Sequence, residues 1–209
     1  MRSAVVLVGG EATRANGQEK YFFTYEGKTF ISRLIESLSV VVDEIVLVAR
    51  DPVQCTRFVD IEGVRCITDI RKGIGPIGGL HAGAEAAGGD LLFVAACDMP
   101  CVNSEVVARL FELINGYDAA IPCWNRDMYE PLHAVYRKNV LLAYLASHNS
   151  LSLRDMVKNL RVTYVPVQEL RRYDPALRTF TNINRLDELN RFNTGTKGGS
   201  GEDSGEKHD

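Results

Sequence analysis

The sequence predicts an α/β protein with a mostly parallel central sheet. Short apolar runs rich in β-branched residues recur along the chain, at residues 5–8, 44–49, 64–68 and 91–96. They show little alternation between apolar and polar residues, which is typical of strands covered on both faces. Stretches with apolar residues at helical spacing separate these runs, and this order of strand and helix indicates parallel strands joined by right-handed crossovers.

Length, charge and cysteine content limit the class of protein. The 209 residues can bury a full core without disulfides, and the formal net charge of −3 gives no indication of a nucleic-acid partner. The five cysteines are odd in number and scattered, which favours a reducing cytosol, and Cys97 and Cys101 are interpreted as packing residues rather than zinc ligands. No signal peptide precedes the first strand, and the apolar run 91–97 is too short to span a bilayer. We therefore expect a cytoplasmic protein without a membrane partner.

A glycine loop after the first strand is the first candidate site. Gly9 and Gly10 follow residues 5–8 directly, and adjacent glycines at a strand end let the backbone approach a ligand and form an anion-binding nest. Arg14 and Lys20 come next, and these two cations could complete a cradle for a polyphosphate. The spacing matches neither the ATPase phosphate loop nor the G-x-G-x-x-G motif. An ordinary strand-to-helix turn with solvated charges remains the alternative.

The chain then continues with a helix and a second glycine-rich loop. Apolar residues at helical spacing predict a helix from Phe30 onward, with Thr29 as its cap. Asp69 follows the strand 64–68 and opens the loop DIRKGIGPIGGL, whose glycines and proline indicate a shaped turn. Residues 77–87 are small and apolar enough to form a helix that packs closely against the sheet.

An aspartate follows the most apolar strand of the chain. The strand 91–96 ends at Cys97-Asp98-Met99-Pro100, and the carboxyl ends of central parallel strands are where open α/β sheets bind their ligands. A carboxylate there suits a magnesium ion that bridges phosphate oxygens, although Asp98 could also merely cap the next turn. Together with the first loop, this residue favours attack on an activated phosphate, assisted by charge and positioning.

The second half of the chain repeats the alternation. We expect a helix from Asn103 or Ser104, a loop over 124–129, extended residues over 130–136, strands over 117–122 and 162–167, and helices over 137–146, 152–158 and 186–192. His133 lies in an apolar stretch and is interpreted as a core or rim histidine. We predict one domain over residues 1–193, followed by a disordered tail over 194–209 that lacks aliphatic and aromatic residues.

Five motifs in register carry a resemblance to a known family. They are VVLVGG with Arg14 and Lys20, Asp69 with GPIGGLHAG, ACDMP (96–100), EPLHAVY (130–136) and FTNIN (180–184). In this order they resemble the molybdenum cofactor guanylyltransferases, also called molybdopterin-guanine dinucleotide synthases. The resemblance implies a Rossmann-like three-layer α/β/α fold of the nucleotide-diphosphosugar transferase type. It also implies transfer of GMP from GTP to the phosphate of molybdopterin, with release of pyrophosphate.

The same resemblance implies a role for each site residue. The catalytic residues would be Arg14, Lys20 and Asp98, with Asp98 as the ligand of Mg²⁺. The nucleotide would be bound by Leu7, Val8, Gly9, Gly10, Lys20, Asp69 and Asp98. The pterin side would be formed by Glu130, Asn182 and Asn184. The implied partners are GTP and molybdopterin, with molybdopterin-insertion proteins and apo-molybdoenzymes as further candidates.

Three other functions stay open at the level of sequence. A cytidylyltransferase acting on the same pterin, and a guanylyltransferase for a cobinamide or sugar phosphate, would use the same fold. A non-catalytic nucleotide-binding partner that delivers cofactor is the third. Val8 stands where the family usually has alanine, and Ala49 where relatives often have asparagine near the nucleotide. These departures concern the choice of base more than the transfer reaction.

Overall fold

The computed structural model describes residues 1–9, 19–69 and 75–183, apart from the side chain of Lys20. The predictions for Gly10, Arg14 and Asn184 lie outside these residues. The same holds for the last helix (186–192), the domain boundary at residue 193 and the tail over 194–209. These remain predictions.

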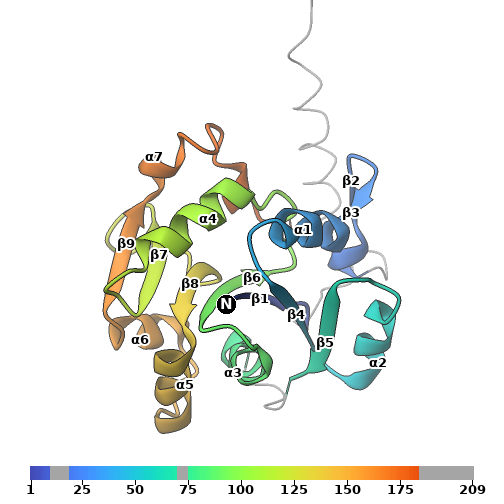
Figure 1. Cartoon of the computed structure of the whole chain (residues 1–209), viewed down its shortest axis with the longest axis horizontal. Coiled ribbons are helices and arrows are strands. Elements are labelled where there is room, and N and C mark those ends of the chain that lie inside the picture. Colours follow the sequence, from blue (N-terminus) through green and yellow to red (C-terminus); the bar gives the residue numbers. More distant parts are fainter. Residues whose placement is uncertain (10–18, 70–74, 184–209) are drawn as a thin grey trace, which may run out of the picture.

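A seven-stranded sheet forms the centre of the molecule, with the strand order β5-β4-β1-β6-β8-β7-β9 (Figure 1). The strands are β1 (Arg2–Leu7), β4 (Glu44–Ala49), β5 (Val64–Thr68), β6 (Leu91–Ala96), β7 (Ala119–Cys123), β8 (His133–Arg137) and β9 (Val162–Pro166). Only β8 among these strands is antiparallel to its neighbours, β6 and β7. The predicted α/β fold with a mostly parallel sheet is therefore confirmed.

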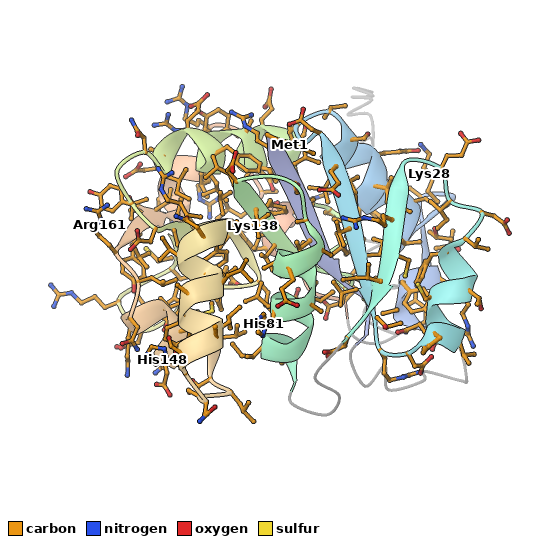
Figure 2. The ribbon with its side chains drawn as sticks, turned by 60° about the horizontal axis from the view of Figure 1, so that its bottom comes forward. Met1, Lys28, His81, Lys138, His148 and Arg161 are labelled. Carbon is orange, nitrogen blue, oxygen red and sulfur yellow. The ribbon has the colours of Figure 1, made fainter. Side chains whose placement is uncertain are left out.

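Helices cover both faces of the sheet and complete three layers (Figure 1). One face packs against α1 (Phe30–Ser39), α4 (Ser104–Leu113) and α7 (Val167–Leu170). The other face packs against α3 (Pro76–Ala86), α5 (Lys138–Ser147) and α6 (Leu153–Lys158). Figure 2 shows α3 and α5 next to each other, where the ammonium of Lys138 donates to the carbonyl oxygen of Ala87. None of the helices in the described part of the chain is long and apolar enough to cross a membrane.

Short elements connect the layers. A two-stranded hairpin, β2 (Thr24–Tyr25) and β3 (Lys28–Thr29), precedes α1. The short helix α2 (Pro52–Cys55) follows β4, and single 3-10 turns lie at η1 (Lys20–Phe22), η2 (Thr56–Phe58) and η3 (Arg178–Phe180).

Side-chain caps fix where the helices begin. Thr29 Oγ1 accepts a hydrogen bond from the backbone amide of Ser32 at 3.2 Å, which confirms the predicted cap of α1. Asn103 Oδ1 accepts from the amides of Glu105 and Val106, so α4 starts at Ser104 with Asn103 as its cap. Residues 130–132 differ from the prediction. They form a turn closed by the His133 amide and the Glu130 carbonyl, and extended structure starts only at His133.

Glycines in α3 bring this helix close to the sheet. A Cβ atom on Gly83 would lie 2.2 Å from Val5 Cγ1 and 3.0 Å from Val48 Cγ2. A Cβ atom on Gly79 would lie 3.1 Å from Leu7 Cδ2. The small residues after Asp69 therefore let α3 approach β1 and β4, as predicted for this segment.

Candidate active site

The carboxyl ends of four neighbouring strands meet at one edge of the sheet. Backbone hydrogen bonds link them, from Asp69 N to Ala49 O (2.8 Å), from Val8 N to Val48 O (3.0 Å) and from Cys97 N to Leu7 O (3.1 Å). The turns after β5, β4, β1 and β6 therefore lie side by side. This edge brings together five of the predicted site residues, Leu7, Val8, Gly9, Asp69 and Asp98.

Gly9 is required by a neighbouring strand as well as by any ligand. A Cβ atom at this position would lie 2.6 Å from the backbone nitrogen of Arg50 and 3.0 Å from the carbonyl carbon of Ala49. The ends of β1 and β4 can therefore approach each other only if residue 9 lacks a side chain. The close approach of a ligand explained Gly9 at the level of sequence, and the packing of β1 against β4 is a second reason for a glycine at this position.

Val8 contributes its backbone to this edge of the sheet. Its side chain is only 1% exposed and belongs to the core beneath the helices α1 and α4. The Val8 side chain is therefore accommodated within the core. The change from alanine at this position consequently adds no exposed side chain to the site.

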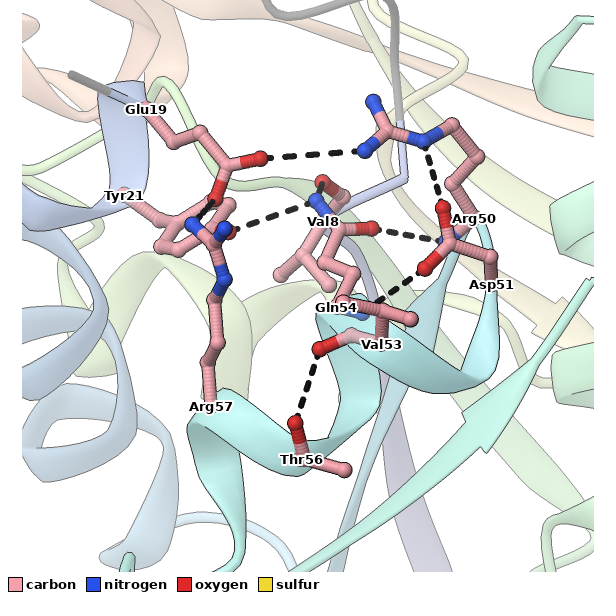
Figure 3. Close-up of polar contacts among 9 residues, drawn as sticks. All are labelled: Val8, Glu19, Tyr21, Arg50, Asp51, Val53, Gln54, Thr56 and Arg57. Carbon is pink, nitrogen blue, oxygen red and sulfur yellow. Dashed lines mark hydrogen bonds and ion pairs between the residues drawn. The ribbon is translucent and has the colours of Figure 1, made fainter. Parts of the chain in front are cut away.

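Gln54, in α2, is a buried polar residue that sequence reasoning missed. Its amide nitrogen Nε2 donates to the Val8 carbonyl at 3.2 Å and to the Tyr21 hydroxyl at 3.4 Å (Figure 3). Its Oε1 accepts from the backbone amide of Arg50 at 2.7 Å. One side chain thus satisfies the free backbone groups at the ends of β1 and β4 and fixes their separation. The Asp51-Pro52 start of a short helix was the available signal, since Asp51 caps α2 by accepting from Gln54 N at 2.7 Å.

Glu19 is the second buried residue that sequence reasoning missed. Its carboxylate is 5% exposed and forms ion pairs with Arg57 Nη1 and, at 3.8 Å, with Arg50 Nη2 (Figure 3). Arg50 also donates from Nε to Asp51 Oδ2 at 2.9 Å. Glu19 directly precedes Lys20, whose backbone begins η1. The chain at Lys20 is therefore fixed to the segment that follows β4.

The segment that carries Asn182 closes against the Asp98 turn. The backbone amide of Ile183 donates to the carbonyl oxygen of Asp98 at 3.0 Å, and the Ile183 side chain is buried with Phe23 and Phe30. Asn182 precedes Ile183 and is exposed. Residues far apart in sequence, Asp98 and Asn182, are thus brought to one place.

Glu130 lies at the same edge, on the other side of β6. The antiparallel strand β8 pairs His133 with Ala95 near the carboxyl end of β6, so the turn before β8 is next to the turn after β6. Glu130 N donates to Pro122 O at 2.9 Å, and Glu130 Oε1 accepts from Trp124 Nε1 at 2.8 Å. Of the two predicted pterin-side residues that the structure describes, only Glu130 lies across β6 from Gly9 and Asp69. Glu130 lies beyond β6, and Asn182 lies against the turn that follows it.

His133 is a core residue, as interpreted from the sequence. Its side chain is fully buried, and its ring lies edge-on to Phe93 and Phe180 with centroid distances of 5.1 and 4.9 Å. Nε2 and Thr179 Oγ1 are 3.2 Å apart, whereas Nδ1 has no hydrogen-bond partner among the described residues. Burial lowers the pKa of His133 to about 3, so the imidazole is neutral near pH 7.

The cysteines behave as packing residues. All five have free thiols and are partly buried, and burial raises the pKa of Cys101 and Cys123. Cys97 packs against the core beneath α1 and α4, and Cys101 packs against the Phe23 and Phe30 cluster. Within residues 1–9, 19–69 and 75–183 no group of three or more His, Cys, Asp or Glu side chains could hold a metal ion.

The single carboxylate of Asp98 suits a hard divalent cation whose other ligands are water molecules and phosphate oxygens of the substrate. Magnesium is usually bound by one or two carboxylates, several waters and substrate phosphates rather than by a cage of protein ligands. Asp98 provides one carboxylate at the carboxyl end of a central strand, beside the turn of Gly9. Enzymes of the nucleotidyltransferase class typically use a divalent metal ion.

Comparisons with known proteins agree with this geometry. Residues 4–165 match the model of the MobA-like NTP transferase domain. A probable molybdenum cofactor guanylyltransferase of Methanosarcina acetivorans is 44% identical over 200 residues, which cover 90% of this chain and 88% of the relative. One from Methanosarcina mazei is 42% identical over 199 residues, which cover 90% and 88%.

A solved structure shows the same fold. The crystal structure of molybdopterin-guanine dinucleotide biosynthesis protein A from Archaeoglobus fulgidus superposes with a TM-score of 0.76 at 34% sequence identity. The similarity covers 94% of this chain and 98% of the other. The chain therefore belongs to the MobA-like NTP transferases, in the family of the molybdenum cofactor guanylyltransferases.

Proposed function

We propose that the chain transfers GMP from GTP to the phosphate of molybdopterin and releases pyrophosphate. The observation that carries this proposal is the hydrogen bond between Cys97 N and Leu7 O, at 3.1 Å. It joins the turn of Gly9 to the turn of Asp98, so both turns lie at one edge of the sheet, which supports a shared site for a phosphate and its metal ion. The names of the relatives supply the identity of the two substrates.

The nucleotide would occupy the edge formed by β5, β4 and β1. We assign contacts with the nucleotide to the backbone of residues 7–10 and to Asp69, which hydrogen-bonds to the end of β4. Arg14 and Lys20 would neutralise charge on the phosphates, because cations placed close to a polyphosphate offset its repulsion for an incoming nucleophile. Gln54 supports this arrangement, since it fixes the backbone at Val8 and Arg50.

Asp98 would hold Mg²⁺ together with phosphate oxygens of GTP. When bound there, the ion would supply positive charge against the pyrophosphate that leaves. Asp98 stands between the two halves of the site, because β6 separates the nucleotide side (β1, β4, β5) from the side of β8 and β7.

The reaction needs alignment more than it needs a base. An oxygen of the molybdopterin phosphate attacks the α-phosphorus of GTP, a new phosphoanhydride bond forms, and the bond to the β-phosphate oxygen breaks. The attacking oxygen carries no proton that must be removed, so the protein mainly positions both phosphates and neutralises their charge. Glu130, Asn182 and Asn184 would orient the acceptor. His133 is unsuited to act as a base, because it is fully buried beneath this region.

We also propose that the reaction takes place in the cytoplasm, with molybdopterin-insertion proteins and apo-molybdoenzymes as receivers of the product. Five free thiols support a reducing compartment.

Thermal shift and product analysis test this proposal. With Mg²⁺ present, GTP should raise the melting temperature more than ATP, CTP or UTP, because a ligand that binds the folded state stabilises it. Incubation with GTP, Mg²⁺ and metal-loaded molybdopterin should then release pyrophosphate and give the guanine dinucleotide by mass. A preference for CTP would instead indicate a cytidylyltransferase. Binding without pyrophosphate release would indicate a non-catalytic partner.

A further inference from the structure

Trp124 is an exposed aromatic residue at the ligand-binding edge of the sheet. It follows β7, whose carboxyl end lies at the same edge as that of β6, and 41% of its surface is exposed. Single exposed apolar residues are common on proteins and need no special explanation. Trp124 differs because its indole Nε1 donates to Glu130 Oε1 at 2.8 Å. This bond fixes the plane of an exposed ring next to a carboxylate.

The loop that carries Trp124 is held in shape by several hydrogen bonds. The Trp124 amide donates to the carbonyl oxygen of Met128 at 2.8 Å, and Asn125 Oδ1 accepts from the Met128 amide at 2.9 Å. From α6, Arg154 Nη2 donates to the carbonyl oxygen of Asp127 at 2.9 Å. A rigid loop presents its aromatic ring at little entropic cost when a ligand binds.

Contacts also tie Trp124 to the Asp98 turn. The indole makes a T-shaped contact with the ring of Phe180, with the ring centroids 5.7 Å apart and an interplanar angle of 71°. Phe180 lies three residues before Ile183, whose amide donates to the Asp98 carbonyl at 3.0 Å. The contact with Phe180 therefore fixes the position of the indole relative to the Asp98 turn.

The strand order separates Trp124 from the proposed nucleotide side. From β1 to β7 there are three strand spacings, through β6 and β8. At about 4.8 Å for each spacing, the distance is about 14 Å. A dinucleotide product needs one ring system on each side of its two phosphates. With Asp98 in the middle, an aromatic platform beyond β8 is placed for the ring of the acceptor rather than for the base of GTP.

We propose that Trp124 and Glu130 form the binding site for the pterin ring of the acceptor, an inference that rests on the proposed transfer to molybdopterin. The indole stacks on the planar pyrimidine part of the pterin. The carboxylate of Glu130 accepts hydrogen bonds from the ring N–H and the exocyclic amino group. An ionised carboxylate has about four acceptor positions, and Trp124 uses one of them. Trp124 is a substrate contact in addition to the residues of the family motifs.

Steady-state kinetics with GTP and metal-loaded molybdopterin test this site. Trp124→Ala should raise the KM for molybdopterin by about 10- to 100-fold, as expected for the loss of one stacking contact. Trp124→Phe should raise it less, because a smaller ring remains. The KM for GTP and the thermal shift with GTP should stay the same. That thermal shift also shows whether each variant is folded.

Tyr117→Ala is the matched control. Tyr117 is 39% exposed and lies before β7, at the opposite end of the strand from Trp124. Its replacement should leave the KM for molybdopterin unchanged. If Trp124→Ala and Tyr117→Ala give the same KM for molybdopterin, Trp124 does not contact the pterin, and the inference is wrong.

The single tryptophan of the chain provides a second test that requires no turnover. Titration with 6-hydroxymethylpterin, a metal-free probe, should quench the Trp124 fluorescence of the wild type at saturable concentrations. Glu130→Gln should weaken this binding about 10-fold, because it removes the charged acceptor. Absence of saturable quenching would overturn the pterin site. If quenching occurs but no GMP is transferred, the pterin site stands and the proposed transferase function fails.

Discussion

The carboxylate of Glu19 lies beneath the surface in an ion pair with the guanidinium of Arg57. Thirty-eight residues of chain separate these partners, and Lys20 follows Glu19 directly. The pair therefore connects the residue before Lys20 to η2. Removal of Arg57, whose side chain is 45% exposed, is costly because the buried carboxylate of Glu19 loses part of its compensation.

We expect Arg57→Ala to weaken both folding and nucleotide binding. Arg50 Nη2 stays 3.8 Å from Glu19, so the free energy of unfolding should fall by only about 1–3 kcal/mol. The KM for GTP should rise because Lys20 loses a fixed attachment, while the KM for molybdopterin should not change. Arg57→Lys should restore part of the GTP affinity. Urea unfolding and initial rates measure these quantities.

The exposed pair of Lys28 and Glu36 is the control for this experiment. Its atoms are 2.8 Å apart, but both side chains are more than half exposed. Exposed pairs contribute about 0–1 kcal/mol, so Lys28→Ala should change neither stability nor the KM for GTP appreciably. Equal effects of Arg57→Ala and Lys28→Ala on the KM for GTP would show that the Glu19–Arg57 pair does not position Lys20.

Asp98→Asn should reduce turnover by about 100-fold or more at saturating substrates, because it removes a charge from the proposed metal site. The fold should persist, since the backbone carbonyl that accepts from Ile183 is unchanged. Mg²⁺-dependent pyrophosphate release measures the loss, and circular dichroism checks the fold. Undiminished Mg²⁺-dependent release in this variant would move the metal to other residues.

Local patterns predicted the elements, and several of the candidate site residues that they marked lie at one edge of the sheet. Unbroken β-branched runs gave the buried strands, and the cap at Thr29 followed from its position before an apolar helical repeat. Asp98 could be placed because it ends the most apolar strand. Each of these signals lies within a few residues of the feature that it predicts.

Long-range pairing was beyond the reach of such patterns. Gln54 and Val8 are separated by 46 residues, and so are His133 and Thr179. A glutamine or glutamate in a polar stretch is usually exposed, so nothing local marks Glu19 as buried. The Asp51-Pro52 helix start indicates where Gln54 lies in the helix, but it does not indicate that the side chain is buried. The insertion of the antiparallel β8 between β6 and β7 likewise depends on which strands pair, and local periodicity carries no information on pairing.

Gly83→Ala should destabilise the protein although alanine favours helices. The new Cβ would lie 2.2 Å from Val5 Cγ1, in a part of the core where side chains cannot move freely. Overpacking of this kind costs about 1–3 kcal/mol and outweighs the gain of about 1 kcal/mol in helix propensity. Gly79→Ala meets the end of the Leu7 side chain at 3.1 Å and Val48 Cγ1 at 3.6 Å, an ordinary contact distance, and should cost less. Chemical denaturation measures the free energy of unfolding of both variants. If Gly83→Ala were more stable than Gly79→Ala, this packing model would be wrong.

The pH dependence of stability should contain a contribution from His133. Burial lowers the pKa of His133 to about 3, whereas an unfolded histidine has a pKa of about 6.5. Between these two values the unfolded chain binds a proton that the folded chain does not. The stability that the neutral histidine provides is therefore complete above about pH 6.5 and is lost as the pH falls toward 3.

His133→Gln removes this titration and leaves a side chain that can still hydrogen-bond to Thr179. Between pH 7.5 and 5.5 the wild type should lose about 1.4 kcal/mol more unfolding free energy than the variant. The titration of Glu44 does not contribute to the change in unfolding free energy between pH 7.5 and 5.5. Burial alone would raise its pKa, but hydrogen bonds from Gly88 N and Ser3 Oγ outweigh that effect and lower it, so its contribution changes only below about pH 4.3. Urea titrations of both proteins at the two pH values give the comparison, and parallel losses would mean that His133 is protonated in the folded state.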